Sequence, residues 1–427
     1  MLQTKKASFY TLGCKLNFSE TSTISRQLSE IGFTKVDFTS KADLVVINTC
    51  SVTENANREC KRIIKKAKKI SPLAYIIVTG CFAQLKPKLI SEIPEVNLVL
   101  GAQEKFNIPK LIKNINKEKI VGCELENLAY ESSFSLYDRT RSFLKIQDGC
   151  DYPCTYCTIP LARGKSRCDS VNNIIKNINI ISKRGVKEIV LTGVNIGEFK
   201  DNNNNFSDLV AKIDENSNID RFRISSIEPN KITNDVINIV KNSNSFMPHF
   251  HIPLQSGSDL ILSRMKRRYN TKLYANKINL IYDEIKNVCI GVDVIVGFPG
   301  ETKEEFEKTI NFIKSLPISY LHVFTYSERD NTEALKLSEV VNISERKERS
   351  KKLRILSNKL RRSFYEKFLH STQKVLFEHE NKNGFLYGFT ENYIKVKIKH
   401  SIELSGSIQT VYLQEIDTDG IMNIKII

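Results

Sequence analysis

Long hydrophobic runs are missing from this sequence. None of its 427 residues falls in an apolar stretch of about 18 residues, the length that a transmembrane helix needs. The N-terminus, MLQTKKASFY, also lacks an apolar segment of the length found in signal peptides. These absences argue against membrane and secreted proteins, and they favour a cytoplasmic enzyme without a membrane partner.

Because nothing marks the chain as secreted, its ten cysteines have no obvious role in disulfide bonds. In a reducing compartment, cysteines in such numbers are more often metal ligands or isolated thiols. The length allows two or three domains, and the composition is globular, with 41% hydrophobic and 26% charged residues.

The net charge of +16 indicates a polyanionic partner, and nucleic acid before membrane. Lys, Ile and Asn are all used heavily in this sequence. The positive charge could therefore reflect a general compositional bias and not a binding partner. The charge alone therefore does not identify the partner.

Three cysteines, Cys150, Cys154 and Cys157, are spaced C-x3-C-x2-C in the segment GCDYPCTYC. They follow the apolar run 143–146, which reads as the end of a strand. Thiolates at this spacing suit an iron–sulfur cubane, and three of them leave one iron free for a substrate or cofactor. Structural zinc usually takes four ligands, often from two C-x2-C pairs, and a disulfide needs paired cysteines. The spacing therefore favours an iron–sulfur cluster.

The first 123 residues alternate between predicted strands and helices, which implies an open parallel α/β domain. We expect strands at 6–12, 43–48, 75–79 and 97–100, and helices at 17–32, 54–70, 86–93 and 105–115.

Three of these strands end close to a cysteine: Cys14, Cys50 and Cys81. Ligands of open α/β sheets bind at the carboxyl ends of the strands, so the three side chains should converge on one edge. A single cysteine there would most simply be a buried small residue. Three at equivalent places predict a second cluster, again with one iron lacking a protein thiolate.

The polar, aperiodic segment 124–140 is the predicted linker to a second domain, residues 141–368. Six strand-plus-helix units follow one another there, which predicts a partial (β/α)6 barrel with its site at the C-terminal mouth. After the strand at 143–146, the units begin with the segments 187–197, 221–229, 250–257, 291–301 and 320–332.

A densely basic helix is expected at 344–367, with either a solvated face or a face toward RNA. Residues 371–427 then form short alternating strands, which predicts a small all-β module, and such barrels commonly bind nucleic acid. Tyr387 and Tyr393 could be exposed or part of its core. Positive charge would come from Lys395, Lys397, Lys399 and His400.

Polar residues at strand ends are candidates for binding a cofactor at the mouth of the barrel. The run GVDVIVGFPGE brings Asp293 and Glu301 to a Gly/Pro turn, where the backbone can approach a nucleoside. Glu228, Gln255 and Ser256 end other strands and could bond ribose hydroxyls or a carboxylate.

Further candidates have an ordinary structural alternative. Arginine suits phosphate or carboxylate, but surface pairing is equally compatible with Arg163, Arg167, Arg223 and Arg329. His249 and His251 flank Phe250 on alternate faces of one strand, and either could lie near a substrate or in the core. No ligand role is expected for Cys60, Cys123, Cys168 and Cys289.

The chain resembles the methylthiotransferase family of radical S-adenosylmethionine (SAM) enzymes over nearly its whole length. The resemblance rests on YTLGCKLN (10–17), INTCSVTENA (47–56), VTGCFAQ (78–84), GCDYPCTYCTIPLARGKSRC (149–168) and HIPLQSGSDLILSRMKRRY (251–269). It implies two [4Fe–4S] clusters, one held by Cys150, Cys154 and Cys157 and an auxiliary one held by Cys14, Cys50 and Cys81. The C-terminal module resembles the RNA-binding TRAM domain.

The resemblance also implies a reaction. One SAM methylates sulfur at the auxiliary cluster, a second yields a 5′-deoxyadenosyl radical that activates a C–H bond, and methylthio is inserted. The form GCKLN looks like the branch that acts on C2 of N6-threonylcarbamoyladenosine at tRNA position 37. Alternatives are the isopentenyladenosine branch, which usually carries GCQMN, and an RNA-binding protein with a structural metal. Expected partners are tRNA, a flavodoxin- or ferredoxin-like electron donor and a sulfur donor.

Overall fold

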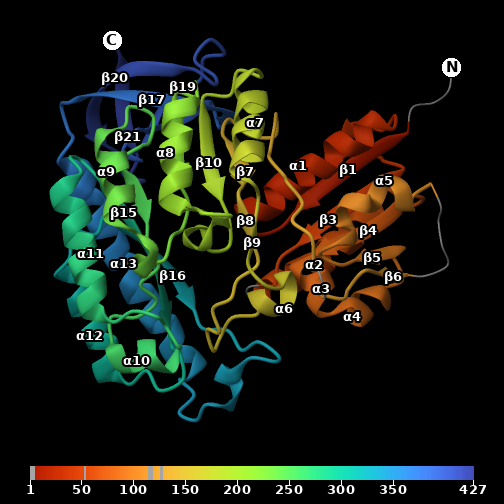
Figure 1. Cartoon of the computed structure of the whole chain (residues 1–427), viewed down its shortest axis with the longest axis horizontal. Helices are drawn as coiled ribbons and strands as arrows, with labels where there is room; N and C mark the ends of the chain where they lie inside the picture. Colours follow the sequence, from red (N-terminus) through yellow and green to blue (C-terminus); the bar gives the residue numbers. More distant parts are fainter. Residues whose placement is uncertain (1–4, 52–53, 114–118, 126–127) are drawn as a thin grey trace.

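The computed structural model describes residues 5–51, 54–113, 119–125 and 128–427. Three sequence features extend beyond these ranges: part of the INTCSVTENA motif, the end of the helix expected at 105–115, and two residues of the expected linker. Figure 1 shows the N-terminal α/β part beside a half-barrel of strands and helices, with the C-terminal strands packed at one end.

The N-terminal part is a six-stranded parallel sheet in the order β2-β1-β3-β4-β5-β6. Side chains alternate across its central strand, so that Val45 and Ile47 pack toward α2 while Leu44 and Val46 pack toward α1. Burial on both faces explains the unbroken apolar run of this strand. The strands are β1 (Lys6–Thr11), β2 (Thr34–Val36), β3 (Leu44–Thr49), β4 (Tyr75–Gly80), β5 (Leu98–Leu100) and β6 (Ile120–Val121).

Helices cover both faces of this sheet, as the alternation predicted. The expected helix at 105–115 is split into a 3-10 turn and a short α-helix, and the short elements β2, β6 and α3 had no sequence signal. The helices are α1 (Lys15–Glu30), α2 (Glu54–Ile70), α3 (Cys81–Leu85), α4 (Pro87–Ser91), η1 (Glu104–Asn107) and α5 (Ile108–Leu111).

The central part confirms the partial (β/α)6 barrel. Its strands form two parallel three-stranded sheets, β7-β10-β13 and β14-β15-β16, which are joined by bridges from Phe222 to Phe246 and from Ser226 to His251. The strands are β7 (Ser142–Lys145), β10 (Glu188–Thr192), β13 (Arg221–Ile224), β14 (His249–His251), β15 (Cys289–Val296) and β16 (Tyr320–Thr325).

Side-chain caps fix where most of the barrel helices begin. Ser170, Asn205, Thr233, Asn270 and Thr302 each accept a backbone N–H from the first turn of the helix that follows. The helices are α7 (Val171–Ser182), α8 (Phe206–Asn216), α9 (Asn234–Asn242), α11 (Thr271–Glu284), α12 (Lys303–Lys314) and α13 (Ile343–Glu366). Smaller elements are α6 (Ile159–Arg163), α10 (Asp259–Arg264), β8 (Gln147–Asp148), β9 (Arg167–Cys168), β11 (Lys200–Asp201), β12 (Asn204–Asn205), η2 (Ile196–Glu198), η3 (Pro229–Lys231) and η4 (Glu333–Lys336).

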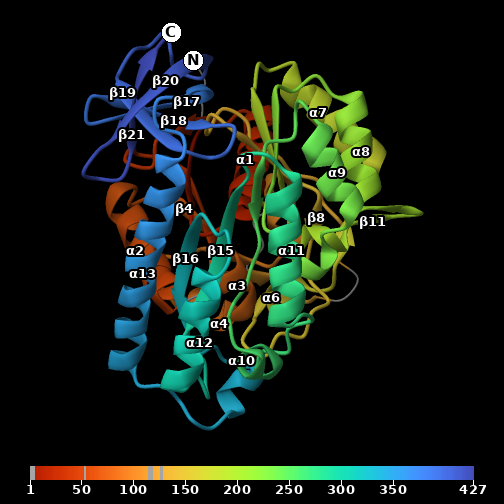
Figure 2. The same cartoon turned by 90° about the vertical axis from the view of Figure 1, so that its left-hand side faces the viewer.

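The C-terminal strands close into a small barrel in the order β17-β18-β19-β21-β20, and closure leaves no exposed sheet edge. Figure 2 shows it above the end of α13, and its core includes Phe364 and Tyr365 of that helix. The strands are β17 (Thr372–Lys382), β18 (Phe385–Thr390), β19 (Lys395–Lys399), β20 (Ile408–Ile416) and β21 (Met422–Ile426). Within the described residues, no helix combines the length and hydrophobicity required to cross a membrane.

Candidate functional site

The loop that carries Cys150, Cys154 and Cys157 follows β8 at the mouth of the half-barrel. Backbone N–H groups point at two of the sulfurs: Tyr152 donates to Cys150 Sγ at 3.4 Å and Ile159 donates to Cys157 Sγ at 3.4 Å. A guanidinium N–H of Arg267 lies 3.0 Å from Cys154 Sγ. Each sulfur therefore faces a donor, which favours negative charge on it. Burial acts in the opposite direction and raises the pKa of Cys150 and of Cys157 to about 12.

The second cysteine triple lies at the carboxyl ends of β1, β3 and β4, which are neighbours in the sheet. Cys50 and Cys81 directly follow β3 and β4, and Cys14 precedes the first residue of α1. Gly13 adopts a φ of +100°, and a Cβ built on it would lie 2.9 Å from Cys50 Sγ. The turn before Cys14 thus approaches Cys50 so closely that only glycine fits. The strand order brings the three residues to one edge.

Buried amide groups hold this edge together. The side chain of Asn17 donates to the carbonyl oxygens of Leu12 at 2.7 Å and of Thr49 at 3.0 Å. The side chain of Asn48 donates in turn to the carbonyl oxygen of Asn17 at 3.1 Å. These bonds connect the segments that carry Cys14 and Cys50.

The two triples face each other across the junction of the sheet and the half-barrel. Helix α3, which begins at Cys81, packs against α6, which begins two residues after Cys157 (Figure 1). The Cys81 thiol also contributes electrostatically to the pKa of Cys157. Two sulfur sites are therefore close neighbours at one junction.

A buried cluster of charges fastens this junction. Arg163 of α6 forms ion pairs with Glu20 of α1 at 2.9 Å and with Asp148 of β8 at 2.9 Å. Lys105 lies 2.6 Å from Glu20, and Lys145 lies 3.5 Å from Asp148. Burial opposes ionisation of Glu20, but these cations outweigh it and lower its pKa to about 2. The guanidinium of Arg163 is thus occupied by protein partners.

A cavity of about 220 Å³ lies next to Cys157, between the cysteine loop and the strand ends of the half-barrel. Two of the predicted cofactor residues, Gln255 and Asp293, line it, together with Tyr156, Phe324 and Arg329. In the described structure, this cavity brings Gln255 and Asp293 next to the cysteine loop.

Gln255 has a strained backbone, with a φ of +66°. Backbone bonds to both sides hold it there: its N–H donates to Asp293 O at 2.8 Å, and its carbonyl accepts from Ile295 at 2.9 Å. The side-chain Oε1 is buried and has no hydrogen-bond partner among the described residues. A buried acceptor of this kind is unfavourable until a donor fills the cavity.

Asp293 lies between two histidines, with its Oδ1 at 2.9 Å from His251 Nε2 and at 3.4 Å from His322 Nδ1. Although burial opposes ionisation, these histidines hold the pKa of Asp293 well below its usual value. The carboxylate is therefore charged at neutral pH.

The other three predicted cofactor residues lie outside this cavity. Glu228 pairs with Arg267, the same arginine that contacts Cys154. Ser256 is buried against Thr309, with 3.3 Å between their hydroxyl oxygens. Glu301 accepts from the backbone of Gly297 and pairs with Arg349 at 2.8 Å, which joins the Gly/Pro turn to α13. Their positions at strand ends correctly predicted that these residues lie at the mouth of the half-barrel. The sequence did not predict that their side chains point to protein partners and not into the cavity.

The remaining arginine and histidine candidates connect parts of the protein. Arg167 pairs with Asp148 at 3.1 Å, and Arg329 donates to Ser51 at 2.5 Å. Arg223 pairs with Glu188 and donates to the carbonyl of Thr390, so it joins the half-barrel to the C-terminal barrel. His249 is buried in a stack with Tyr393, whose ring centroid lies 4.2 Å away.

Lys15 follows Cys14 and has no ion-pair partner among the described residues. Lys15 is accessible to solvent, although many protein atoms lie around its ammonium group. Burial lowers the pKa of Lys15, and Tyr393, Arg141, Cys14 and Asp293 act on it electrostatically. The ammonium group is therefore within electrostatic reach of Cys14 and of Asp293 in the half-barrel.

Two family models match the chain, one for each of the first two parts. Residues 6–101 match the Uncharacterized protein family UPF0004, and residues 144–313 match the Radical SAM superfamily. The chain is 37% identical to Threonylcarbamoyladenosine tRNA methylthiotransferase MtaB of Bacillus subtilis, with 95% of this chain and 92% of the relative covered. It is 32% identical to tRNA-2-methylthio-N(6)-dimethylallyladenosine synthase of Thermodesulfovibrio yellowstonii, with 94% of each covered.

The chain belongs to the radical SAM methylthiotransferase family. It is therefore a radical SAM enzyme, and the cofactors of its family are SAM and two [4Fe–4S] clusters. Among solved structures, this methylthiotransferase resembles the radical SAM methyltransferase TsrM of Kitasatospora setae, with a TM-score of 0.58 and 12% identity over 75% of this chain and 73% of that one. It also resembles the radical SAM enzyme OxsB, with a TM-score of 0.51 and 16% identity over 86% of this chain and 57% of that one. At these identities the likeness concerns the fold.

Proposed function

We propose that this enzyme adds a methylthio group to C2 of N6-threonylcarbamoyladenosine at position 37 of tRNA. The observation that carries the proposal is the pair of cysteine triples that face each other across one junction, beside a cavity with an unsatisfied acceptor. The relatives named for this activity, at up to 37% identity over most of the chain, support the substrate.

In this proposal, Cys150, Cys154 and Cys157 hold one [4Fe–4S] cluster and Cys14, Cys50 and Cys81 hold the auxiliary cluster. The donor sets fit, because each has three sulfurs and leaves one iron without a protein ligand. When bound, the clusters and SAM supply one-electron reduction, the activating radical and the methylated sulfur. The protein positions both sites and the substrate carbon, and the buried Arg163 cluster fixes their separation.

We assign the cavity beside Cys157 to SAM. Gln255 would accept a hydrogen bond from it, and the Asp293 carboxylate would bind its hydroxyl or ammonium donors. Glu228 acts indirectly, because it fixes Arg267 against Cys154. Ser256 and Glu301 stabilise neighbouring turns and are not part of the proposed contacts.

The threonylcarbamoyl group carries a carboxylate that the isopentenyl group lacks. We assign this carboxylate to Lys15, whose ammonium group lies near Cys14 and the half-barrel and lacks an anionic partner in the described structure. A neutral, apolar substituent would leave that charge uncompensated. Electrons would come from a flavodoxin- or ferredoxin-like donor and sulfur from a separate donor.

The proposal is tested with two tRNA pools, one lacking the threonylcarbamoyl modification and one lacking the isopentenyl modification. The reconstituted enzyme should form methylthio product only in the pool that retains threonylcarbamoyladenosine. Product only in the other pool would identify the isopentenyladenosine enzyme instead. Tight tRNA binding without SAM cleavage, and zinc in place of iron, would identify an RNA-binding protein with a structural metal.

A further inference from the structure

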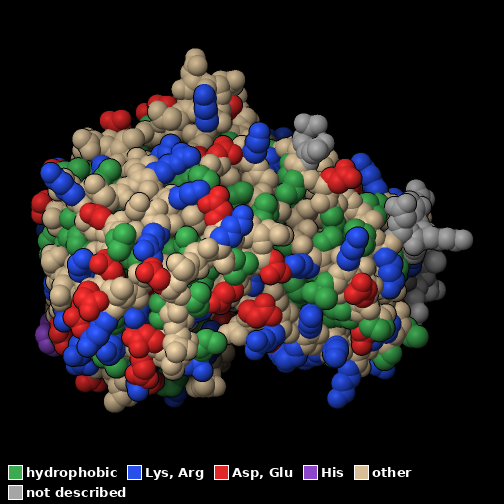
Figure 3. All heavy atoms as spheres, turned by 90° about the horizontal axis from the view of Figure 1, so that it is seen from below, with side chains coloured by type: hydrophobic (Ala, Val, Ile, Leu, Met, Phe, Trp, Pro, Cys, Tyr) green, Lys and Arg blue, Asp and Glu red, His purple; other side chains and the backbone are tan. Residues whose placement is uncertain are grey.

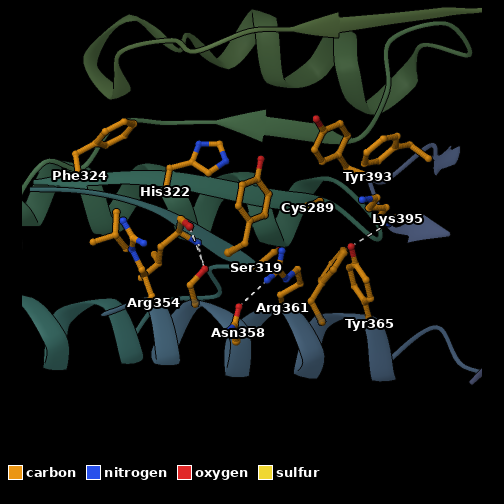
Figure 4. A pocket seen from close by; sticks show the side chains of 16 residues that line it. Cys289, Ser319, His322, Phe324, Arg354, Asn358, Arg361, Tyr365, Tyr393 and Lys395 are labelled. Atoms are coloured by element: carbon orange, nitrogen blue, oxygen red, sulfur yellow. Dashed lines mark hydrogen bonds between the residues drawn. The ribbon is translucent and has the colours of Figure 1, made fainter. Parts of the chain in front are cut away.

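A second cavity, of about 720 Å³, follows the free edge of β16, between that strand, α13 and the C-terminal barrel (Figure 4). Three cationic side chains line it: Arg354 and Arg361 from α13, and Lys395 from β19. None of the residues that line it is acidic. The cavity is therefore suited to an anion.

The two arginines differ from others on the same helix. Near its start, Arg346 pairs with Glu328 at 2.6 Å and Arg349 pairs with Glu301 at 2.8 Å. In contrast, Arg354 and Arg361 have no ion pair in the described part of the chain. There, the side chain of Arg361 donates one hydrogen bond, to the amide oxygen of Asn358 at 2.6 Å. Figure 4 shows both side chains extending from α13 toward β16.

Aromatic side chains line the cavity from the other face of β16, the face turned away from α13. Tyr320, His322 and Phe324 alternate along β16 and therefore project from one side of the strand. Figure 4 shows this for His322 and Phe324. Phe324 is 41% exposed and makes no ring contact within the described residues. Tyr393, by contrast, is already stacked between His249 and Phe389. The face of Phe324 is thus available to a planar ligand.

The cavity shares a lining residue with the site already described. Phe324 also lines the cavity beside Cys157, which we assign to SAM. At the other end, Phe389 and Lys395 also line a third cavity. Its lining holds both cations and carboxylates: Lys35, Arg139, Arg141, Lys382, Asp138, Glu378 and Glu380. The β16–α13 cavity therefore lies between the C-terminal barrel and the cavity beside Cys157.

We propose that the β16–α13 cavity binds an unpaired nucleotide adjacent to the adenosine that is modified. Arg354 and Arg361 bind the phosphates on either side of this nucleotide, and its base stacks on Phe324 beside His322. Guanidinium forks suit phosphate, and aromatic side chains bind unpaired bases in sequence-tolerant RNA recognition. This inference rests on the proposed function, because it assumes an RNA substrate.

The test compares two double variants of the full, cluster-containing chain. Arg354→Ala/Arg361→Ala removes the proposed contacts. Lys352→Ala/Lys359→Ala is the matched control, because it removes two exposed cations at the same spacing on α13 that do not line the cavity. Binding of a fluorescent RNA stem-loop with an unpaired loop is measured by anisotropy at several salt concentrations.

The arginine variant should bind the stem-loop about ten-fold more weakly. Its salt dependence should fall by about 0.7 in log–log slope for each phosphate contact removed. The lysine variant should keep the wild-type affinity and slope. Phe324→Leu should weaken binding to the stem-loop but not to a fully paired duplex, because only an unpaired base can stack there.

Wild-type affinity and slope in the arginine variant, with stem-loop binding by the wild type intact, would overturn this site and leave the proposed function standing. An equal loss in the lysine variant would also overturn it, because the effect would then come from the general field of the helix. If the wild type neither binds the stem-loop nor modifies tRNA, the proposed function itself fails.

Discussion

The two cysteine triples lie on either side of one junction, but one comes from a single loop and the other from three strand ends. Cys150, Cys154 and Cys157 share one loop. The donors to their sulfurs are the backbone N–H groups of Tyr152 and Ile159 and the side chain of Arg267. Cys14, Cys50 and Cys81 come from three strand ends, and only the sheet order brings them together. A metal-binding motif within one loop can be predicted from the cysteine spacing alone. A site whose residues come from several strands can be predicted only if the strand order is predicted as well.

The largest expected difference between the triples is in SAM chemistry. Changing Cys150, Cys154 and Cys157 to Ala should abolish the formation of 5′-deoxyadenosine by anaerobically reduced protein. Changing Cys14, Cys50 and Cys81 to Ala should preserve that product and abolish methylthio-adenosine. Both products are measured by liquid chromatography and mass spectrometry. Loss of 5′-deoxyadenosine in both variants would show that the triples do not have separate roles.

The junction that holds the triples together can be broken at Arg163. Replacing it with Met leaves Glu20 and Asp148 buried with fewer cations, which should cost about 3–5 kcal/mol of unfolding free energy. Arg362→Met is the control, because this arginine is exposed and pairs with the exposed Glu366, so its loss should cost about 1 kcal/mol or less. Urea denaturation measures both. Equal costs would mean that the buried cluster does not fasten the junction.

A smaller effect should separate the substrate branches. Lys15→Met should raise KM for threonylcarbamoyl-tRNA about ten-fold, because it removes the proposed partner of the carboxylate. Reductive cleavage of SAM should be unchanged, and Lys15→Arg, which keeps the charge, should restore most of the affinity. Loss of SAM cleavage in the Met variant would place Lys15 in the cluster site instead.

The smallest effect concerns Gln255. Its side chain is lost in both Gln255→Ala and Gln255→Gly, so both should weaken SAM binding about five-fold, the effect of one hydrogen bond. Only Gly relieves the left-handed backbone, and that variant should be about 1 kcal/mol more stable than the Ala variant. Isothermal titration and thermal unfolding separate these effects. Different SAM affinities in the two variants would show that the backbone, not the amide, sets the binding.

Much of the fold could be predicted because strands and helices alternate with clear periodicity. The sequence predicts four of the six N-terminal strands (β1, β3, β4 and β5), the six barrel strands, the C-terminal β module and the basic helix α13. Short elements such as β2 (Thr34–Val36) and α3 (Cys81–Leu85) were missed, because a few residues carry no period. The last strand, β21 (Met422–Ile426), was missed as well, although Asp419 and Gly420 mark a turn just before it.

The buried charges were beyond sequence reasoning. Glu20, Lys105 and Lys145 look like ordinary surface residues in their elements, and only the packing of α1, η1 and β7 brings them together. Arg163 likewise looks like an exposed arginine in the sequence, so the sequence predicts it only as a possible phosphate or carboxylate contact. A charge pattern does not show which charged side chains find each other in the interior.

The most direct test of the account is the iron and acid-labile sulfide content after anaerobic reconstitution. The wild type is compared with the Cys150/Cys154/Cys157→Ala variant. The wild type should contain about eight irons per chain, for two cubanes, and the variant about four, for one cubane. If that variant lost all its iron, Cys14, Cys50 and Cys81 would be thiols without a cluster, and the proposed methylthiolation would lose its main support.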